Sequence, residues 1–258
     1  MPTADTAKPV RADDIEAAAR KELAACYRLF DALGWAEGIF NHITVRVPSP
    51  GGAPHYLINP FGLHYAEVTA DNLVKIDVEG RDVDDCGRAV NHAGFVIHGA
   101  IHEARDDAHC VMHVHTTAGC AVACKEEGLR YDNFYSAMMC GDVGYHDYEG
   151  VTTNLDERPR LVAALGARSH LILRNHGLLV VGRDVPESFQ RLWTLQRACE
   201  IQLAGDAGRG PNREIDAGVL DRVPSTRLKM NPAGRGGVAT LLFDAMVRRH
   251  AIDFTREA

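Results

Sequence analysis

The stretch Cys110-Val111-Met112-His113-Val114-His115 alternates in character from one residue to the next, which predicts a β-strand. Side chains two positions apart on a strand point to the same face. His113 and His115 therefore project together from one face, while Met112 and Val114 face the core. One strand thus supplies both core contacts and a pair of imidazoles.

Segments with the periodicity of strands and helices lie on both sides of this stretch. Further strands are predicted over residues 41–47, 55–59, 73–78, 171–173 and 178–181. Helices are predicted over residues 12–33, 93–105, 116–124, 184–203 and 240–250. Strands and helices interleave without strict alternation, and several strands look linked by hairpins. This pattern predicts one domain of the α/β class, with helices flanking a mostly antiparallel sheet.

The chain divides into three ranges by composition and periodicity. Residues 1–12 form a polar tail, and residues 13–205 contain most of the periodic segments. Residues 206–258 form a C-terminal extension with one short helix. The Gly/Asp/Arg-rich segment 205–224 at the start of this extension is expected to be mobile.

Charge and composition exclude several classes of protein. Lys plus Arg number 28 against 35 for Asp plus Glu, which gives a net charge of −7 and a pI near 6.0. Proteins that bind nucleic acid or anionic membranes usually carry the opposite balance, so neither partner is expected. No segment approaches the ~18 apolar residues of a membrane span, and the N-terminus lacks an apolar signal-peptide centre. The seven scattered cysteines indicate reduced core thiols, and a cytoplasmic location follows.

Histidines are concentrated in the middle of the chain. There are 13 in total, and nine of them fall between His92 and His176. His176 stands between two apolar strands and precedes Gly177, which lets the backbone turn beside a crowded site. A catalytic zinc site takes three protein ligands, so His113, His115 and His176 are the metal candidates. The alternative is that these are buried structural histidines that hydrogen-bond their neighbours.

From about Leu23 to Leu203 the sequence resembles the class II aldolase/adducin domain family. Six motifs in the family's order carry the resemblance: Asn41–Arg46, Leu57–Gly62, Gly94–His98, Val111–Thr116, Tyr148–Gly150 and Leu173–Leu179. The resemblance implies a three-layer α/β/α fold around a central mixed, largely antiparallel sheet. It also implies a homo-oligomer, often a tetramer.

The resemblance also implies a metal and a type of chemistry. In the family's aldolases, histidines that match His113, His115 and His176 hold one divalent ion per subunit, usually zinc. Manganese, cobalt and iron also accept three imidazoles, so the ligands do not choose among them. The ion chelates neighbouring hydroxyl and carbonyl oxygens and stabilises an enediolate. Aldol cleavage and decarboxylation both use such an anion.

Two departures from the aldolase pattern bear on the substrate. The sugar-phosphate aldolases carry a catalytic glutamate nineteen residues before the first metal histidine, where this chain has Gly94. Their phosphate-binding hydroxyls are also missing, because Asn59–Gly62 replaces a threonine-containing turn and Asn91-His92-Ala93 replaces a serine pair. A phosphorylated ketose is therefore not expected. Asn41 is the one phosphate contact that matches.

The remaining polar residues of these motifs supply the site candidates. The substrate-binding candidates are Asn41, Asn59, Gly62 and Asn91. The candidates for the proton-transferring groups are His42, His92, Tyr135 and Glu149. Tyr135 lies near the position at which the aldolases bring a tyrosine from a neighbouring subunit, although Phe134 is the closer match. His98 is expected to be a hydrogen-bonded core histidine, and His102 part of a solvated helix end.

These features predict a metal-dependent carbon–carbon lyase. Retro-aldol cleavage must remove a proton from a hydroxyl and needs a base, whereas decarboxylation needs none to release carbon dioxide. Without the glutamate, decarboxylation of a small hydroxylated aromatic or dicarboxylic acid is preferred. The alternatives are aldol cleavage of a non-phosphorylated substrate, iron-dependent oxygenation, and a non-catalytic interaction domain like that of adducin.

Overall fold

The computed structural model describes residues 11–49, 52–150, 155–230 and 237–254, without the side chains of residues 92, 93, 224 and 227–230. Its strands are β1 His42–Val47, β2 His55–Ile58, β3 Val74–Ile76, β4 Cys110–Val114, β5 Val143–His146, β6 His170–Leu173 and β7 Gly177–Gly182. Its α-helices are α1 Ala12–Ala32, α2 His92–Ala104, α3 Thr117–Ala123, α4 Phe134–Ala137, α5 Arg158–Leu165, α6 Val185–Asp206, α7 Ala217–Met230 and α8 Val238–Arg249. Two short 3-10 helices are η1 Tyr65–Glu67 and η2 Leu155–Glu157.

All seven strands form one sheet in the order β3-β2-β1-β4-β7-β6-β5. Every pair of neighbouring strands is antiparallel except β5 and β6, which are parallel. The predicted mixed, largely antiparallel sheet is thus confirmed. The histidine-bearing strand β4 is the central one, and the register aligns His113 with His42 of β1 on one side and Leu179 of β7 on the other.

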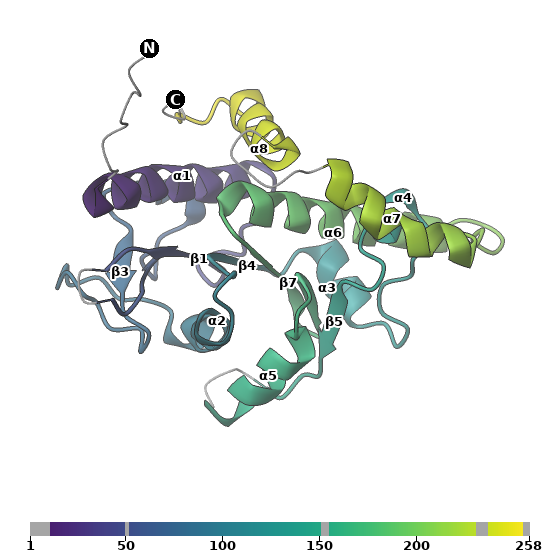
Figure 1. Ribbon diagram of the computed structural model, residues 1–258, viewed down its shortest axis with the longest axis horizontal. Helices are drawn as coiled ribbons and strands as arrows, with labels where there is room; N and C mark the ends of the chain where they lie inside the picture. The colour runs from purple at the N-terminus through teal and green to yellow at the C-terminus, as the bar shows by residue number, and fades with distance from the viewer. Residues whose placement is uncertain (1–10, 50–51, 151–154, 231–236, 255–258) are drawn as a thin grey trace, which may run out of the picture.

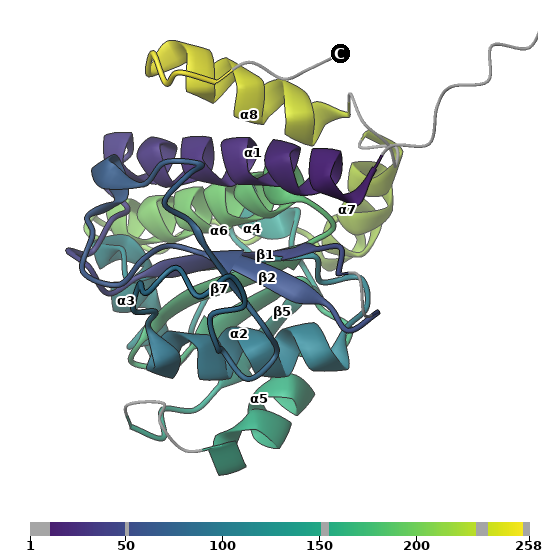
Figure 2. The ribbon, with the colours of Figure 1, turned by 90° about the vertical axis from the view of Figure 1, so that its left-hand side faces the viewer.

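Helices cover both faces of the sheet and complete the three layers (Figure 1). α1 and α6 lie on one face, and α8 lies outside them; α2 and α5 lie on the opposite face (Figure 2). Within the described ranges, none of the helices combines the length and apolar character that a membrane crossing requires.

The two faces of β4 belong to two different hydrophobic clusters. Met112 and Val114 pack in the larger cluster with residues of α1 and α6, as the alternation predicted. Val111, on the other face, packs with Ile97 and Ile101 of α2. These side chains are almost fully buried, and each such burial contributes roughly 1.5–3 kcal/mol. β4 is therefore fixed from both sides, and His113 shares the face that α2 covers.

Several elements were not predicted. The four-residue elements β5 and α4, the short helix α5 and both 3-10 helices were missed. The helix α7 was missed as well, because one short helix was expected after residue 205 and the structure has both α7 and α8. The polar segment 205–224, expected to be mobile, contains the end of α6 and the start of α7.

Candidate metal centre

Three histidines meet where β4 ends and β7 begins. His113 lies in β4, His115 follows the end of that strand, and His176 lies in the turn between β6 and β7. Because β4 and β7 are antiparallel neighbours, the end of one strand lies beside the start of the other. The Nε2 atoms of His113 and His115 are 2.6 Å apart, and the His176 ring centroid is 4.7 Å from each of the other two. One potential ligand atom from each residue lies within 4.8 Å of the others.

The turn that presents His176 is held by its own backbone and by α3. Asn175 has a φ of +56°, and its N–H donates to the carbonyl oxygen of Ala123 (3.1 Å). The Cys120 thiol donates to the carbonyl oxygen of His176 (3.0 Å). A Cβ on Gly177 would lie 2.4 Å from the carbonyl oxygen of Val114, closer than real Cβ atoms come. Glycine is therefore required for the turn to approach β4.

The histidine side chains are prepared to act as neutral ligands. The Nδ1–H of His113 donates to the carbonyl oxygen of Leu178 (2.9 Å), which leaves its Nε2 with a free lone pair. Burial lowers the pKa of His113 well below its ordinary value and the pKa of His176 to about 4. Burial also lowers the pKa of His115. Three neutral imidazoles form a donor set that suits zinc and related divalent ions.

One side of this cluster is open. His113 is buried, whereas His115 and His176 are only half-buried. The arrangement therefore differs from a closed structural site, in which protein ligands surround the ion completely. Three converging imidazoles with an accessible side match the requirement for a catalytic metal centre.

A family model matches most of the chain. The Class II Aldolase and Adducin N-terminal domain matches residues 21–203. The chain belongs to this family. The resemblance inferred from the motifs is thereby confirmed, together with the α/β fold.

Members of the class II aldolase/adducin family resemble the chain over most of its length. An aldolase II superfamily protein from Pseudomonas syringae is 42% identical, with a TM-score of 0.84 over 92% of this chain and 93% of that one. L-fuculose 1-phosphate aldolase from Glaciozyma antarctica PI12 is 26% identical, with a TM-score of 0.80 over 95% of this chain and 93% of that one. α-Adducin of Mus musculus is 44% identical over 221 residues, which are 84% of this chain and 30% of α-adducin.

Among the family's substrate-binding positions, two asparagines already have structural partners. Asn59 Oδ1 accepts from the Tyr27 hydroxyl (2.9 Å). Asn91 caps α2, because its Oδ1 accepts from the N–H of Gly94 (3.2 Å). Gly62 occupies a turn with a φ of +95°. The buried Asn41 Oδ1 has no partner among the described residues, so Asn41 is the best placed of the four to bind a further group.

The proton-transfer candidates lie in different surroundings. Glu149 is paired with Arg160 (2.7 Å), which lowers the pKa of its carboxyl. Tyr135 packs edge-to-face on Trp193 of α6 (5.5 Å), so its own chain does not bring it to the three histidines. His92 is the first residue of α2, and its side chain lies outside the description. His42 is buried beside His113, with the ring centroids 5.8 Å apart.

Two further polar pairs were not recognised in the sequence. His102 was assigned to a solvated helix end, but it is 1% exposed and hydrogen-bonded to Thr44 (2.7 Å). His146 at the end of β5 forms a buried pair with Glu157 (2.9 Å). The partner of His102 comes from a distant part of the chain, and the partner of His146 lies eleven residues along it. His98 was correctly expected to be a hydrogen-bonded core histidine.

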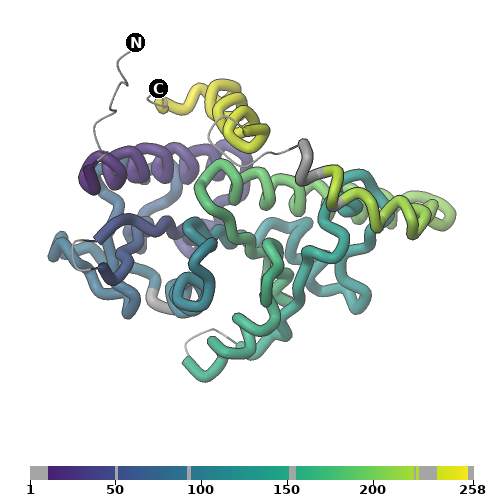
Figure 3. Tube along the Cα trace, in the orientation of Figure 1, coloured from purple at the N-terminus to yellow at the C-terminus, as the bar shows by residue number. Residues whose placement is uncertain are grey.

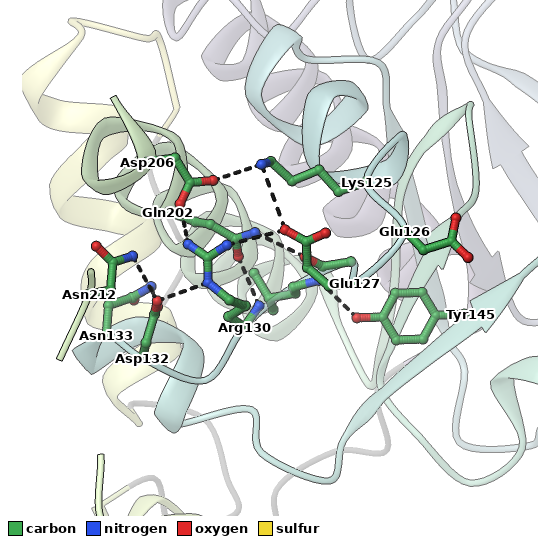
Figure 4. A network of polar contacts seen from close by, with 12 residues as sticks. Lys125, Glu126, Glu127, Arg130, Asp132, Asn133, Tyr145, Gln202, Asp206 and Asn212 are labelled. Atoms are coloured by element: carbon green, nitrogen blue, oxygen red, sulfur yellow. Dashed lines mark hydrogen bonds and ion pairs between the residues drawn. The ribbon is translucent and has the colours of Figure 1, made fainter. Parts of the chain in front are cut away.

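The loop after α3 is fastened to the end of α6 by ion pairs and hydrogen bonds (Figure 4). Asp206 pairs with Lys125 (2.7 Å) and with Arg130. Gln202 donates to the carbonyl oxygen of Gly128 (2.9 Å). These contacts tie the segment after α3 to the end of α6.

Proposed function

We propose that the protein is a divalent-metal-dependent carbon–carbon lyase in which His113, His115 and His176 bind one ion, with zinc the first choice. The observation that carries the proposal is the convergence of three neutral imidazoles on a site with an open side. A divalent cation bound there would supply the positive charge that stabilises an enolate. The chain's own contribution is to hold the ligands neutral and correctly oriented.

Decarboxylation of a small hydroxylated aromatic or dicarboxylic acid is the reaction that we prefer. Retro-aldol cleavage needs a base to take a hydroxyl proton, and Gly94 has no side chain to do so. The carboxylate of Glu149 is a poor substitute, because its pairing with Arg160 lowers its pKa. Loss of carbon dioxide requires no such base. Aldol cleavage of a non-phosphorylated hydroxy-keto substrate is the alternative.

The test combines metal analysis with product detection. The protein should be stripped, loaded separately with Zn²⁺, Mn²⁺, Co²⁺ or Fe²⁺, and incubated with a panel of hydroxylated acids and hydroxy-keto compounds. Carbon dioxide release supports decarboxylation, and aldehyde release supports aldol cleavage. A matched control is His109→Ala, which changes an exposed histidine away from the three ligands. Failure of the unmodified chain to bind any of the four ions would reject the proposal.

A non-catalytic interaction domain is the second candidate, favoured by the 44% identity with α-adducin. Such a domain can keep the fold while the metal-binding residues contribute only to stability. It would bind metal without turnover across the whole panel, and His113→Ala would leave partner binding intact. Turnover that disappears in His113→Ala would reject this second candidate.

We also propose a cytoplasmic homo-oligomer, with a tetramer expected from the family resemblance. Phe134 of α4 is 71% exposed, and exposed aromatic side chains are frequent at protein interfaces. Light scattering coupled to size-exclusion chromatography measures the mass directly. A tetramer is four times the 28.2 kDa chain, and a Phe134→Asp variant should shift the equilibrium toward smaller species.

A further inference from the structure

A second group of histidines lies between β1 and α2, beside the three-histidine cluster. His102 Nδ1 is 2.7 Å from the carbonyl oxygen of Ala108, and His102 Nε2 is 2.7 Å from Thr44 Oγ1. Thr44 Oγ1 is in turn 2.8 Å from His98 Nδ1. All three side chains are buried, so water does not compete for these bonds. They form one continuous chain of hydrogen bonds.

The donor and acceptor of each hydrogen bond in this series are fixed by the carbonyl group of Ala108 at its end. A carbonyl oxygen only accepts, so the Nδ1 of His102 must carry the proton. Burial lowers the pKa of His102 to about 3, so its ring is neutral at pH 7 and its Nε2 accepts from the Thr44 hydroxyl. Thr44 has then used its only proton and must accept from His98 Nδ1–H. Each bond therefore points toward Ala108, and His98 has a single tautomer.

The oriented ring of His98 supports His42. The two rings stack with their centroids 4.1 Å apart and an angle of 17° between their planes. On the other side, His42 meets His113 edge-to-face, at 88°. A Cβ on Gly94 would lie 2.1 Å from His42 Nε2, so the ring fits only because that residue is glycine. The position of His42 is thus set by three neighbours.

The backbone of Gly94 lies against the ring of His42, but it does not meet the geometry of a hydrogen bond to either ring nitrogen. Both of its ring nitrogens are buried and have no partner among the described residues. Leaving a buried polar atom unpaired costs about 1–3 kcal/mol, so native structures usually pair such groups with protein, water or ligand. A ring that is held firmly and lacks any partner is suited to receive one from outside the chain.

We propose that His42 contacts the substrate directly, and that Thr44, His98 and His102 are the residues that position it. The contact is a hydrogen bond from one ring nitrogen to an oxygen of a ligand bound at the three histidines. This inference rests on the proposed function, because it needs a ligand at that cluster.

The surroundings of His42 define the chemical class of this ligand group. An imidazole ring carries at least one N–H, so His42 offers a hydrogen-bond donor. The register places His42 directly opposite His113, on the face that bears the metal candidates. A carboxylate or hydroxyl oxygen of a small hydroxy acid accepts such a hydrogen bond. A phosphate would ordinarily be met by a cation instead.

The experiment measures binding of a metal-chelating oxygen ligand, so it does not depend on turnover. Acetohydroxamate is titrated into Co²⁺-loaded protein, and its affinity is read from the visible absorption of the metal. His42→Leu removes the hydrogen bond, and His42→Asn keeps a donor on a shorter side chain. His109→Leu is the matched control on an exposed histidine.

We expect His42→Leu to bind Co²⁺ like the unmodified chain but to bind acetohydroxamate about tenfold or more weakly, the loss expected for one hydrogen bond to a charged group. His42→Asn should recover part of that loss. Unchanged acetohydroxamate affinity in His42→Leu would overturn the inference and leave the metal proposal standing. Failure of the unmodified chain to bind Co²⁺ would reject both.

A second pair of variants tests the positioning role and covers the case in which His42→Leu does not fold. Thr44→Val removes the hydroxyl at nearly constant shape, and Thr44→Ser keeps it. We expect Thr44→Val to weaken acetohydroxamate binding severalfold without changing Co²⁺ content, and Thr44→Ser to restore it. Equal affinities in the two variants would contradict the positioning role.

Discussion

The two groups of histidines on either side of His113 are built in opposite ways. In the cluster of His113, His115 and His176, the ring of His113 hydrogen-bonds the backbone, and the Nε2 atoms of His113 and His115 lie 2.6 Å apart. In the chain through His98 and His102, backbone and hydroxyl groups use three of the four ring nitrogens. The comparison teaches that burial alone does not mark a binding residue. What separates the groups is that backbone and hydroxyl groups already use most of the ring nitrogens of His98 and His102.

We expect the largest effect from replacing a histidine of the three-histidine cluster. We expect His113→Ala, His115→Ala and His176→Ala each to weaken Zn²⁺ binding by roughly a hundredfold or more, since even indirect supports of such sites are worth 10–100-fold. Mass spectrometry under native conditions, or elemental analysis after dialysis, measures the loss. His102→Gln is the matched control from the other group, and it should retain the metal. If His102→Gln lost as much metal as the three ligand variants, the two groups of histidines would not differ in metal binding.

Acid should destabilise the metal-free protein through its buried histidines. The pKa of His102 is about 3 and that of His42 about 4, against an ordinary value of 6.5. Between pH 6.5 and pH 4 the unfolded chain therefore binds protons that the folded chain does not, so stability is full above pH 6.5 and falls as the pH drops. From pH 6.5 to 5 the loss is about 2 kcal/mol per histidine.

Urea unfolding of the chelator-treated protein at several pH values measures this slope. His102→Gln should flatten the dependence by about one proton, because it removes one of the buried histidines whose pKa is lowered, while His109→Gln should not. A slope that is the same in all three proteins would show that His102 does not resist protonation in the folded state.

Breaking the hydrogen-bond chain should cost stability but not metal. Thr44→Val leaves His98 Nδ1 and His102 Nε2 without their shared partner, and we expect a loss of about 1–3 kcal/mol in the free energy of unfolding. Thr44→Ser should lose less. Chemical denaturation in the presence of chelator gives the values, and a Zn²⁺ content below that of the unmodified chain would contradict the separation of the two groups.

The smallest effect is expected at the rim of the three-histidine cluster. Cys120 donates a thiol hydrogen bond to the carbonyl oxygen of His176, which is a weak interaction. Cys120→Ala should therefore change Zn²⁺ affinity by less than about threefold, well below the 10–100-fold range of strong indirect supports. Competition with a chromogenic chelator has the required sensitivity. A larger change would mean that this contact orients the ligand.

Features of the site that depend on residues close together in the sequence could be predicted from the sequence. The pair His113 and His115 was predictable, because alternation along a strand is local. His176 stood out because Gly177 follows it at a strand break, and the structure shows the crowding that requires the glycine. In both cases residues close together in the chain carry the signal.

The errors concern contacts between distant segments. His102 looks like a polar residue near a helix end, and only the packing of α2 on β1 buries it against Thr44. The strand β5 was missed because Val143–His146 is short and contains a glycine, and its pairing with β6 decides its conformation. The structural partners of the candidates Glu149 and Tyr135 come from α5 and α6. Such partners are not visible in a single sequence.

The chain leaves β4 at His115, travels through α3, α4, β5, α5 and β6, and comes back to the same place at His176 (Figure 3). A cation shared by these two residues would act as a crosslink that closes a ring of roughly sixty residues, and closing so long a ring removes much of the freedom of the unfolded chain. The segment between His115 and His176 contains β5 and β6 at one edge of the sheet. With the cation bound, this segment would unfold locally less often than without it. Amide hydrogen exchange in β5 and β6 would record that slowing far from the ligands themselves.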